Sequence, residues 1–309
     1  MKLKKPKFWD YNKPNLLSNF LYPISKIIEI LTIFKFKKKV KIENVKTICI
    51  GNIYLGGTGK TSLAIKLKEL FDKHNINSCF IKKDYSDQID EQKLLSKFGE
   101  VFVNKSRIKA LKKAASANYK VAIFDDGLQD KSIKYDLSFV CFNKTNLIGN
   151  GRMIPAGPLR EGLDNIKIYK NIFLIGNNEN TQTFKDQINN KYGSLKFFDC
   201  RYIFKNLNNF NDKEKYVVFS GIGNFGTLKD MLKQTKMNLV EFLEFPDHYN
   251  FSENDIGKIF KIAEEKKAKV ITTEKDFLRL DEKIQKKIGC IKIEIEIKQI
   301  EELKKILSF

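Results

Sequence analysis

A glycine-rich segment that ends in lysine and threonine is the strongest chemical signal in the sequence. It reads GNIYLGGTGKT over residues 51–61 and lies between an apolar run and the helical pattern Leu63–Phe71. In that context backbone N–H groups surround phosphate oxygens, a lysine reaches the β- and γ-phosphates, and a threonine hydroxyl ligates Mg²⁺. A glycine turn without a ligand is the alternative, because the strict pattern requires glycine where this chain has tyrosine. We predict phosphate binding by Tyr54, Leu55, Gly56, Gly57, Thr58, Gly59, Lys60 and Thr61.

Two adjacent carboxylates follow another apolar run. Asp125 and Asp126 come directly after Val121–Phe124. A phosphate-binding loop needs such an acid to hold Mg²⁺, directly or through water, because the metal neutralises charge on the transferring phosphoryl group. On its own an aspartate pair at a strand end more often caps the next turn. Together with Lys60 and Thr61 it predicts a magnesium site.

Two further segments resemble loops that bind ligands. Residues 149–161, GNGRMIPAGPLRE, contain too much glycine and proline for regular structure, and long loops in compact domains are usually functional. Arg152 and Arg160 in this loop match anionic groups, or else they are solvated surface arginines. The segment Gly221–Gly226 nominally fits a dinucleotide fingerprint, but a tight strand–helix turn is the more common explanation of such a match.

Alternating strands and helices must position these segments. From Lys46 onward the pattern is typical of an α/β fold with a mostly parallel sheet of the P-loop NTPase type and a second, smaller α/β domain. We predict an N-terminal segment over 1–42, a P-loop core domain over 43–190 and a C-terminal domain over 191–309, with Lys196–Asn208 as an extended connector. The expected strands are Thr47–Ile50, Ser78–Ile81, Val101–Val103, Val121–Phe124, Leu137–Phe142, Ile172–Ile175, Tyr216–Phe219, Leu239–Phe245, Val270–Thr272 and Ile291–Ile297.

The first 42 residues are basic and partly apolar. They carry eleven lysines against two acidic residues, a net charge of +9, with lysines clustered before and after an apolar stretch from Leu16 to Phe36. The apolar residues recur at helical spacing, and Pro23 is expected to start a new helical segment. A basic amphipathic helix with Trp9 and Tyr11 nearby as interface-type aromatics fits the surface of an anionic membrane, and packing on its own domain is the alternative. The flanking lysines are Lys2, Lys4, Lys5 and Lys7, and Lys35, Lys37, Lys38, Lys39 and Lys41.

Composition excludes several classes of protein. With 42% hydrophobic residues, 30% charged residues and 6 prolines, the chain is neither disordered nor collagen-like. Its five cysteines are widely spaced in apolar runs and predict reduced core thiols, and two histidines exclude a histidine-rich metal site. The net charge of +20 favours anionic partners.

Taken in chain order, these segments resemble the tetraacyldisaccharide 4′-kinases of lipid A biosynthesis. The resemblance is carried by residues 51–61 and 149–161, together with DEQKLL at 90–95, DDGLQD at 125–130, SGIGN at 220–224, FPDH at 245–248 and TTEKD at 272–276. It implies transfer of the γ-phosphate of ATP, with Mg²⁺, to the 4′-hydroxyl of tetraacyldisaccharide 1-phosphate. It also implies a peripheral enzyme, expected to be a monomer, at the cytoplasmic face of the bacterial inner membrane.

The same resemblance assigns roles to individual residues. Asp90 matches the family's catalytic aspartate, which accepts the proton of the sugar hydroxyl, and His248 matches the histidine that pairs with it. Domain closure is expected to bring the imidazole to this base, and a capping or packing role for His248 is the alternative. Arg160 is implied near the phosphates and Glu161 near the metal, beside Thr61, Asp125 and Asp126.

The chain departs from the family pattern at two places. Lys82-Lys83-Asp84-Tyr85 stands where the family usually has Ser-Arg-Gly-Tyr, and Leu128 and Asp130 replace a phenylalanine and a histidine.

Two other functions use part of the same pattern. A P-loop NTPase switch would hydrolyse ATP or GTP to drive delivery of a partner or metal cofactor, and would need no base such as Asp90. A nucleic-acid-stimulated ATPase would use the positive charge, but no nucleic-acid-binding motif accompanies it, and we expect no nucleic acid partner.

Overall fold

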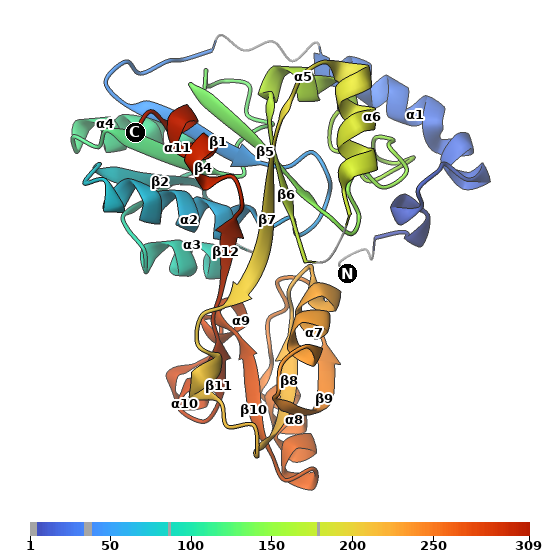
Figure 1. Ribbon diagram of the computed structural model, residues 1–309, viewed down its shortest axis with the longest axis vertical. Helices are drawn as coiled ribbons and strands as arrows, with labels where there is room; N and C mark the ends of the chain where they lie inside the picture. Colours follow the sequence, from blue (N-terminus) through green and yellow to red (C-terminus); the bar gives the residue numbers. More distant parts are fainter. Residues whose placement is uncertain (1–4, 34–38, 86–87, 178–179) are drawn as a thin grey trace. The chain divides into compact units, whose positions relative to one another are not determined.

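The fold consists of two mainly parallel β-sheets with helices packed against them (Figure 1). The computed structural model describes residues 5–33, 39–85, 88–177 and 180–309. Of the N-terminal lysines, Lys2, Lys4, Lys35, Lys37 and Lys38 lie outside the described residues. The predicted α/β class is confirmed.

The larger sheet has the phosphate-binding segment at its centre. Among the described residues it has eight strands, in the order β12-β7-β6-β5-β1-β4-β2-β3. The pairings of β1 with β4 and β5, of β2 with β4, and of β6 with β5 and β7 are parallel. The strands are β1 (Lys46–Gly51), β2 (Ser78–Lys83), β3 (Val101–Asn104), β4 (Val121–Asp125), β5 (Leu137–Asn143), β6 (Asn171–Ile175), β7 (Lys196–Phe204) and β12 (Ile293–Ile297).

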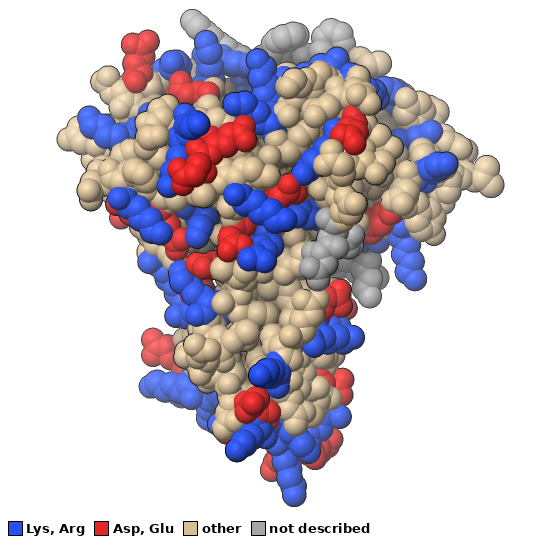
Figure 2. Space-filling model, viewed as in Figure 1, with Lys and Arg blue, Asp and Glu red and all other residues tan. Residues whose placement is uncertain are grey.

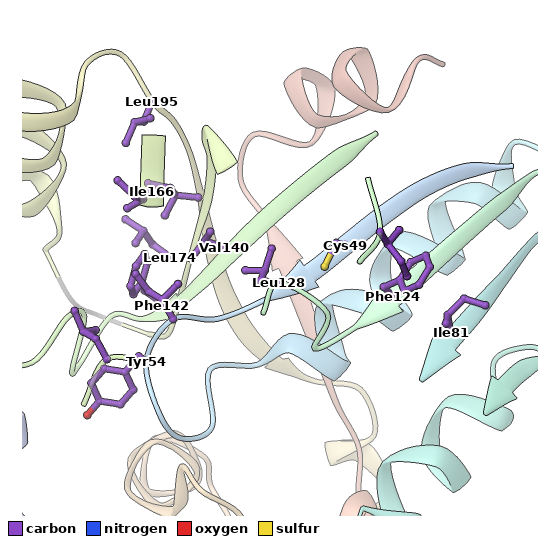
Figure 3. Close-up of a cluster of buried hydrophobic side chains, with 14 of the residues drawn as sticks. Cys49, Tyr54, Ile81, Phe124, Leu128, Val140, Phe142, Ile166, Leu174 and Leu195 are labelled. Carbon is purple, nitrogen blue, oxygen red and sulfur yellow. The ribbon is translucent and has the colours of Figure 1, made fainter. Parts of the chain in front are cut away.

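Helices cover this sheet on both faces, which explains why its central strands are apolar along their whole length. Cys49 and Phe124 belong to the core on one face, where α4 and α6 also contribute (Figure 3). Helix α2 packs against β1, β2 and β4. The associated helices are η1 (Lys7–Asp10), α1 (Leu16–Ile33), α2 (Lys60–Lys73), α4 (Arg107–Ser116), η2 (Leu163–Asn165), α5 (Ile166–Tyr169), α6 (Gln182–Tyr192) and α11 (Ile300–Leu307).

The smaller sheet has the order β11-β10-β8-β9, and its pairings are parallel. Alternate residues of β8 enter two cores: Tyr216 and Val218 face one, and Val217 and Phe219 face the other. The elements are α3 (Ile89–Ser96), η3 (Leu207–Asn209), β8 (Lys215–Ser220), α7 (Phe225–Lys233), β9 (Asn238–Glu244), α8 (Glu253–Glu265), β10 (Ala268–Thr273), α9 (Glu274–Phe277), α10 (Glu282–Gln285) and β11 (Gly289–Ile291).

The chain divides into two compact units that are discontinuous in sequence. Unit 1 contains Met1–Lys83, Phe102–Cys200 and Ile297–Phe309, and unit 2 contains Asp84–Val101 and Arg201–Glu296. The predicted boundary near residue 190 is close to the main division. It does not anticipate that the segment carrying Asp90 belongs with the C-terminal unit, or that the last residues return to the first.

Three local predictions differ from the structure. Lys196–Phe204 is a strand of the larger sheet and not only a connector, and the run Ile291–Ile297 contains two strands that enter different sheets. Pro23 lies inside the single helix α1, so the predicted break is wrong. Proline removes one helical N–H donor, and the carbonyl that loses its partner belongs to Asn19, which is exposed to solvent.

Candidate active site

The phosphate-binding segment begins where β1 ends and is followed directly by α2. Gly56 and Gly59 have φ angles of 136° and 78°, which side chains with a Cβ rarely adopt. The buried Asn52 amide donates to the carbonyl oxygens of Tyr54 and Gly56 at 2.5 and 3.1 Å, so it holds the turn in place. The 14-residue helix α2 then starts at Lys60 and directs its free N–H groups toward this loop.

Tyr54 explains how the segment tolerates a tyrosine where the strict pattern has glycine. Its side chain is only 3% exposed, and its hydroxyl hydrogen-bonds to Asp10, while Lys5 Nζ donates to it at 2.8 Å. Burial and the Asp10 carboxylate both raise the pKa of the Tyr54 hydroxyl above its ordinary value. The Tyr54 side chain therefore contacts the N-terminal segment. The prediction that Tyr54 binds phosphate then concerns its backbone N–H group and not its side chain.

The first aspartate lies beside the phosphate-binding segment because β4 pairs with β1, with Ile50 opposite Asp125. Thr61 Oγ1 donates to Asp125 Oδ2 at 3.1 Å, and Lys82 Nζ donates to the same oxygen at 2.6 Å. The other oxygen, Oδ1, is buried and has no hydrogen-bond partner among the described residues. The structure thus brings Thr61 and Asp125 together as the sequence predicted.

Asp126 lies between two cations. Lys60 Nζ is 3.7 Å from its Oδ1, and Arg160 Nη1 donates to both of its oxygens at 3.2 Å. Burial raises the pKa of Asp126, but the charges of Lys60 and Arg160 outweigh burial, so the pKa is lowered. Its φ of 62° is in the left-handed region, a conformation that costs about 1 kcal/mol or more and that clusters at functional sites.

Glu161 is connected to this pair through Gln129. Gln129 Nε2 donates to Glu161 Oε1 at 3.0 Å, and the side-chain oxygen of Gln129, Oε1, lies 3.5 Å from Arg160 Nη1. Glu161 also accepts hydrogen bonds from Asn165 and Tyr169, at 2.7 and 2.9 Å. The structure therefore gathers Lys60, Asp126, Arg160 and Glu161 into one network.

The oxygen donors present suit Mg²⁺, which prefers hard oxygen ligands, often only one or two from protein. The unpartnered Asp125 Oδ1 and the neighbouring Thr61 hydroxyl provide such donors. No group of three or more histidine, cysteine, aspartate or glutamate side chains suited to a metal occurs among the described residues. That pattern is consistent with an ion held largely by phosphate oxygens and water.

The loop over residues 149–161 binds α1 as well as forming part of the site. Ser18 and Ser25 of α1 donate to the carbonyl oxygens of Ala156 and Met153 at 2.7 and 2.8 Å. Arg152 lies 4.3 Å from the ring centre of Tyr22, so its guanidinium contacts α1, whereas Arg160 contacts Asp126. Of the two arginines, Arg160 belongs to the network of Lys60, Asp126 and Glu161.

Trp9 also belongs to this loop interface. It is 7% exposed, and its indole N–H donates to the Pro155 carbonyl at 3.0 Å. A Cβ at Gly149 would lie 2.2 Å from the Trp9 carbonyl oxygen, and the φ of Gly149 is +56°, so this position requires glycine. The expectation that Trp9 is an interface aromatic is wrong, because the ring packs on the loop; Tyr11 is 50% exposed.

A second cluster of charged side chains surrounds Asp90 in unit 2. The carboxylate is 3% exposed, with Oδ1 at 3.1 Å from His248 Nδ1 and Oδ2 at 2.6 Å from Arg279 Nη2. Lys275 Nζ lies 3.8 Å from Oδ2 and 2.7 Å from Glu91 Oε1. Each carboxylate oxygen has a second lone pair, so Asp90 retains capacity to accept another hydrogen bond.

Electrostatics keep Asp90 ionised. Burial alone raises the pKa of the Asp90 carboxyl. The hydrogen bond from His248 and the charges of Lys275 and Arg279 outweigh burial and lower this pKa to about 2. His248 reaches the carboxylate from a strained backbone, with a φ of 55°. Since Asp90 and His248 belong to the same unit, the pair forms without the domain closure that the sequence suggested.

The carboxyl ends of parallel strands bring this cluster together. Gly221 follows β8, His248 follows β9, and Asp276 follows β10. Asp276 is fully buried and accepts hydrogen bonds from Ser220, from the Gly221 N–H and from Arg279. A Cβ at Gly221 would lie 2.9 Å from the Pro246 carbonyl oxygen, so packing explains this glycine without a dinucleotide.

Sequence reasoning assigned no role to several residues of these networks, among them Asn52, Lys82, Gln129 and Arg279. Gln129 lies within the segment DDGLQD and Arg279 lies just after TTEKD, so their neighbourhood was the available signal. Asp130, which replaces a histidine of the family pattern, pairs with Arg107 at 3.4 Å and accepts a hydrogen bond from Ser132.

We compared the whole chain with models of known protein families, and one family matches it. The model of the family described as tetraacyldisaccharide-1-P 4′-kinase matches residues 17–308. The chain belongs to this family. The match includes the phosphate-binding segment, the paired aspartates, Asp90 and His248, so it extends over both units.

Individual relatives match over almost their whole lengths. A tetraacyldisaccharide 4′-kinase of Pelagibacter ubique (strain HTCC1062) is 52% identical over 297 residues, which cover 96% of this chain and 95% of the relative. One from Rickettsia canadensis (strain McKiel) is 31% identical over 321 residues, covering 96% and 94%. The crystal structure of LpxK from Aquifex aeolicus in complex with ATP has a TM-score of 0.72 at 23% identity, covering 94% of this chain and 98% of that one, and shows the shared fold.

Proposed function

We propose that the protein transfers the γ-phosphate of ATP to the 4′-hydroxyl of tetraacyldisaccharide 1-phosphate, a step of lipid A biosynthesis. The observation that carries the proposal is the family match over residues 17–308, since it includes both the phosphate-binding segment and Asp90. The relative from Pelagibacter ubique, a tetraacyldisaccharide 4′-kinase that is 52% identical to this chain, supports the same substrate.

The first unit binds the nucleotide in this proposal. The N–H groups of residues 54–61 surround the phosphates, and the Lys60 ammonium and Arg160 guanidinium neutralise the oxygens of the transferring group. Thr61 and Asp125 hold Mg²⁺, with Asp126 and Glu161 as the further acidic residues of the site. When bound, the ion offsets negative charge that develops on the phosphate oxygens.

Asp90 receives the proton of the acceptor in this proposal. The 4′-oxygen forms a bond to the γ-phosphorus, the bond from that phosphorus to the β–γ bridging oxygen breaks, and ADP leaves. The hydroxyl proton passes to Asp90, whose carboxylate is oriented by His248 and Arg279. A low pKa is compatible with this role, because a loose phosphoryl-transfer transition state depends more on positioning and charge than on a strong base.

The decisive experiment supplies the purified chain with ATP, Mg²⁺ and tetraacyldisaccharide 1-phosphate in detergent or mixed vesicles. We expect stoichiometric formation of ADP and the 4′-phosphorylated lipid, detected by mass spectrometry. Release of phosphate from ATP that is unaffected by the lipid, with no phosphorylated lipid formed, would contradict the kinase and favour the NTPase switch.

We also propose that α1 docks the enzyme on the cytoplasmic face of the inner membrane, where its acylated substrate lies. The helix turns its small polar side chains inward, with Ser18 and Ser25 buried, and leaves its apolar side exposed. The exposed fractions are 78% for Phe20, 59% for Ile27 and 59% for Leu31. Among the described residues, no helix combines the length and apolarity needed to cross a bilayer. A surface-bound helix accounts for the exposed apolar side of α1.

Replacing Phe20 and Ile27 together with asparagine is expected to weaken binding to anionic vesicles by about tenfold or more, because burying each side chain is worth roughly 1.5–3 kcal/mol. Vesicle sedimentation measures this change, and the melting temperature should stay constant, since both side chains are exposed. Unchanged sedimentation would rule out this face of α1. Point substitutions are preferable to deletion of residues 1–42, which would also remove Ser18 and Trp9 from the loop over residues 149–161.

The basic charge is better explained by this docking than by nucleic acid. On the face of the described residues in Figure 2, Lys and Arg side chains are interspersed with acidic and uncharged ones. Nucleic-acid grooves instead present continuous positive charge along the backbone path. We propose that the enzyme acts as a monomer on the membrane, and analytical ultracentrifugation in detergent tests this state.

A further inference from the structure

Lys82 is a buried lysine that the proposed reaction does not yet use. It lies at the carboxyl end of β2, its side chain is 1% exposed, and it pairs with Asp125, whose side chain is fully buried. The distance from Lys82 Nζ to Asp125 Oδ2 is 2.6 Å. The family pattern that the sequence resembles usually has serine at this position.

Strand pairing explains how Lys82 reaches the metal site. Strands β2 and β4 are parallel neighbours, with Ile81 opposite Phe124. The next residues on the two strands are Lys82 and Asp125, so the same register places them side by side at the carboxyl edge of the sheet. A long side chain there must either leave the edge or find a counter-charge, and Asp125 provides one.

The two oxygens of Asp125 are used differently. Oδ2 accepts both the Lys82 ammonium and the Thr61 hydroxyl, whereas Oδ1 is buried with no partner among the described residues. Burying a carboxylate without a counter-charge is costly, and the Lys82 ammonium supplies that counter-charge to Asp125. It also fixes the rotation of the carboxylate.

We propose that Lys82 is a positioning residue and built-in counter-ion for Asp125, which holds Oδ2 so that Oδ1 stays available to a ligand, and which lowers the affinity of the site for Mg²⁺. This inference rests on the proposed function. The second effect follows from repulsion, because the ammonium and the metal ion are two cations that share one carboxylate in a poorly hydrated site. Lys60, Lys82 and Arg160 already balance the charges of Asp125, Asp126 and Glu161, so a further dication binds best when it arrives with the negative phosphate chain.

The test replaces Lys82 with methionine, which has a similar shape and no charge, and uses Lys112→Met on the exposed side of α4 as the matched control. Binding of ADP is titrated with Mg²⁺ by calorimetry, and melting temperatures are measured without metal. We expect the variant to melt at a lower temperature without metal and to need about three- to tenfold less Mg²⁺ for half-maximal ADP binding. The control should match the unsubstituted protein in both measurements.

Two results would overturn the inference. An unchanged or higher Mg²⁺ requirement would show that Lys82 does not compete with the ion. Weaker binding of ADP in the absence of Mg²⁺, with an unchanged metal requirement, would make Lys82 a phosphate ligand instead. Lys82→Gln keeps a donor for Asp125 and provides the same Mg²⁺ comparison if the methionine variant does not fold. Failure of the unsubstituted protein to bind ADP with Mg²⁺ at all would instead contradict the proposed function.

Discussion

Replacing Asp90 with asparagine is expected to lower kcat for lipid phosphorylation by about 10²–10⁴-fold, the usual loss when a positioned proton acceptor is removed. Asparagine keeps the size of the side chain but cannot accept the hydroxyl proton. Binding of ATP should be unchanged, because none of the groups proposed to bind the phosphates belongs to Asp90. Initial rates at saturating lipid and equilibrium binding of ATP measure the two effects separately.

A pH profile tests whether Asp90 is ionised, as this role requires. Because the pKa of Asp90 is about 2, the carboxylate is ionised from about pH 5 to about pH 8, and kcat should show no limb from Asp90 in that range. A limb near pH 6 that is absent from the asparagine variant would contradict this assignment. The ionised Asp90 carboxylate also stabilises the fold. This stabilisation is present above the ordinary pKa of 3.8 and is lost as the pH falls through the folded-state pKa of about 2.

The asparagine variant also removes one of the two carboxylates paired with Arg279, leaving Asp276 as the other, so stability must be measured beside activity. Asp212→Asn, at an exposed position of the same unit, is the matched control and should retain full activity. If the Asp90 variant unfolds at assay temperature, activity at lower temperature separates the two causes. Normal turnover by a folded Asp90→Asn protein would remove this residue from the mechanism.

Replacing Lys60 with methionine is expected to reduce turnover by about 10²–10³-fold and to weaken ATP binding. Charge stabilisation is the main protein contribution to phosphoryl transfer, and one missing group of this kind typically costs that much. The fold should survive, since the ion pair of Lys60 with Asp126 is long, at 3.7 Å. Single-turnover rates and ATP binding measure the expected losses.

Lys66→Met provides the control for this substitution. Lys66 lies later on the same helix, where it pairs with Glu69 at 3.7 Å, so it matches Lys60 in chemistry and local structure but not in its proposed role. Equal turnover in the Lys60 and Lys66 variants would exclude Lys60 as a phosphate-binding group.

The larger sheet was predictable because its strands are short apolar runs with chemical signals at their ends. The same reasoning failed for Lys196–Phe204, whose mixed sequence becomes a strand only because β6 lies beside it. It also failed for residues 84–101, which are close to β2 in sequence but belong to the second unit. Strand pairing and unit membership are long-range contacts, and local periodicity does not encode them.

The phosphate-binding segment and Asp125 were found from residue type and spacing, whereas Asp90 and His248 came from resemblance alone. The tertiary structure added their partners: Arg279 and Lys275 surround Asp90, and Lys82 pairs with Asp125. The spacing of residues in the sequence does not predict these ion pairs, because each cation reaches its carboxylate from another segment of the chain.

The sequence by itself determined the chemistry of the phosphate loop, the α/β class and the amphipathic character of the N-terminal helix. Backbone conformation at glycines, hydrophobic period and residue order carry that information locally. Only the tertiary structure decided which face of α1 is exposed, which cations keep Asp90 ionised, which lysine pairs with Asp125, and that Asp90 and His248 share one unit. These properties depend on burial and on distances between side chains that are far apart in the chain, so they arise only when the strands have paired.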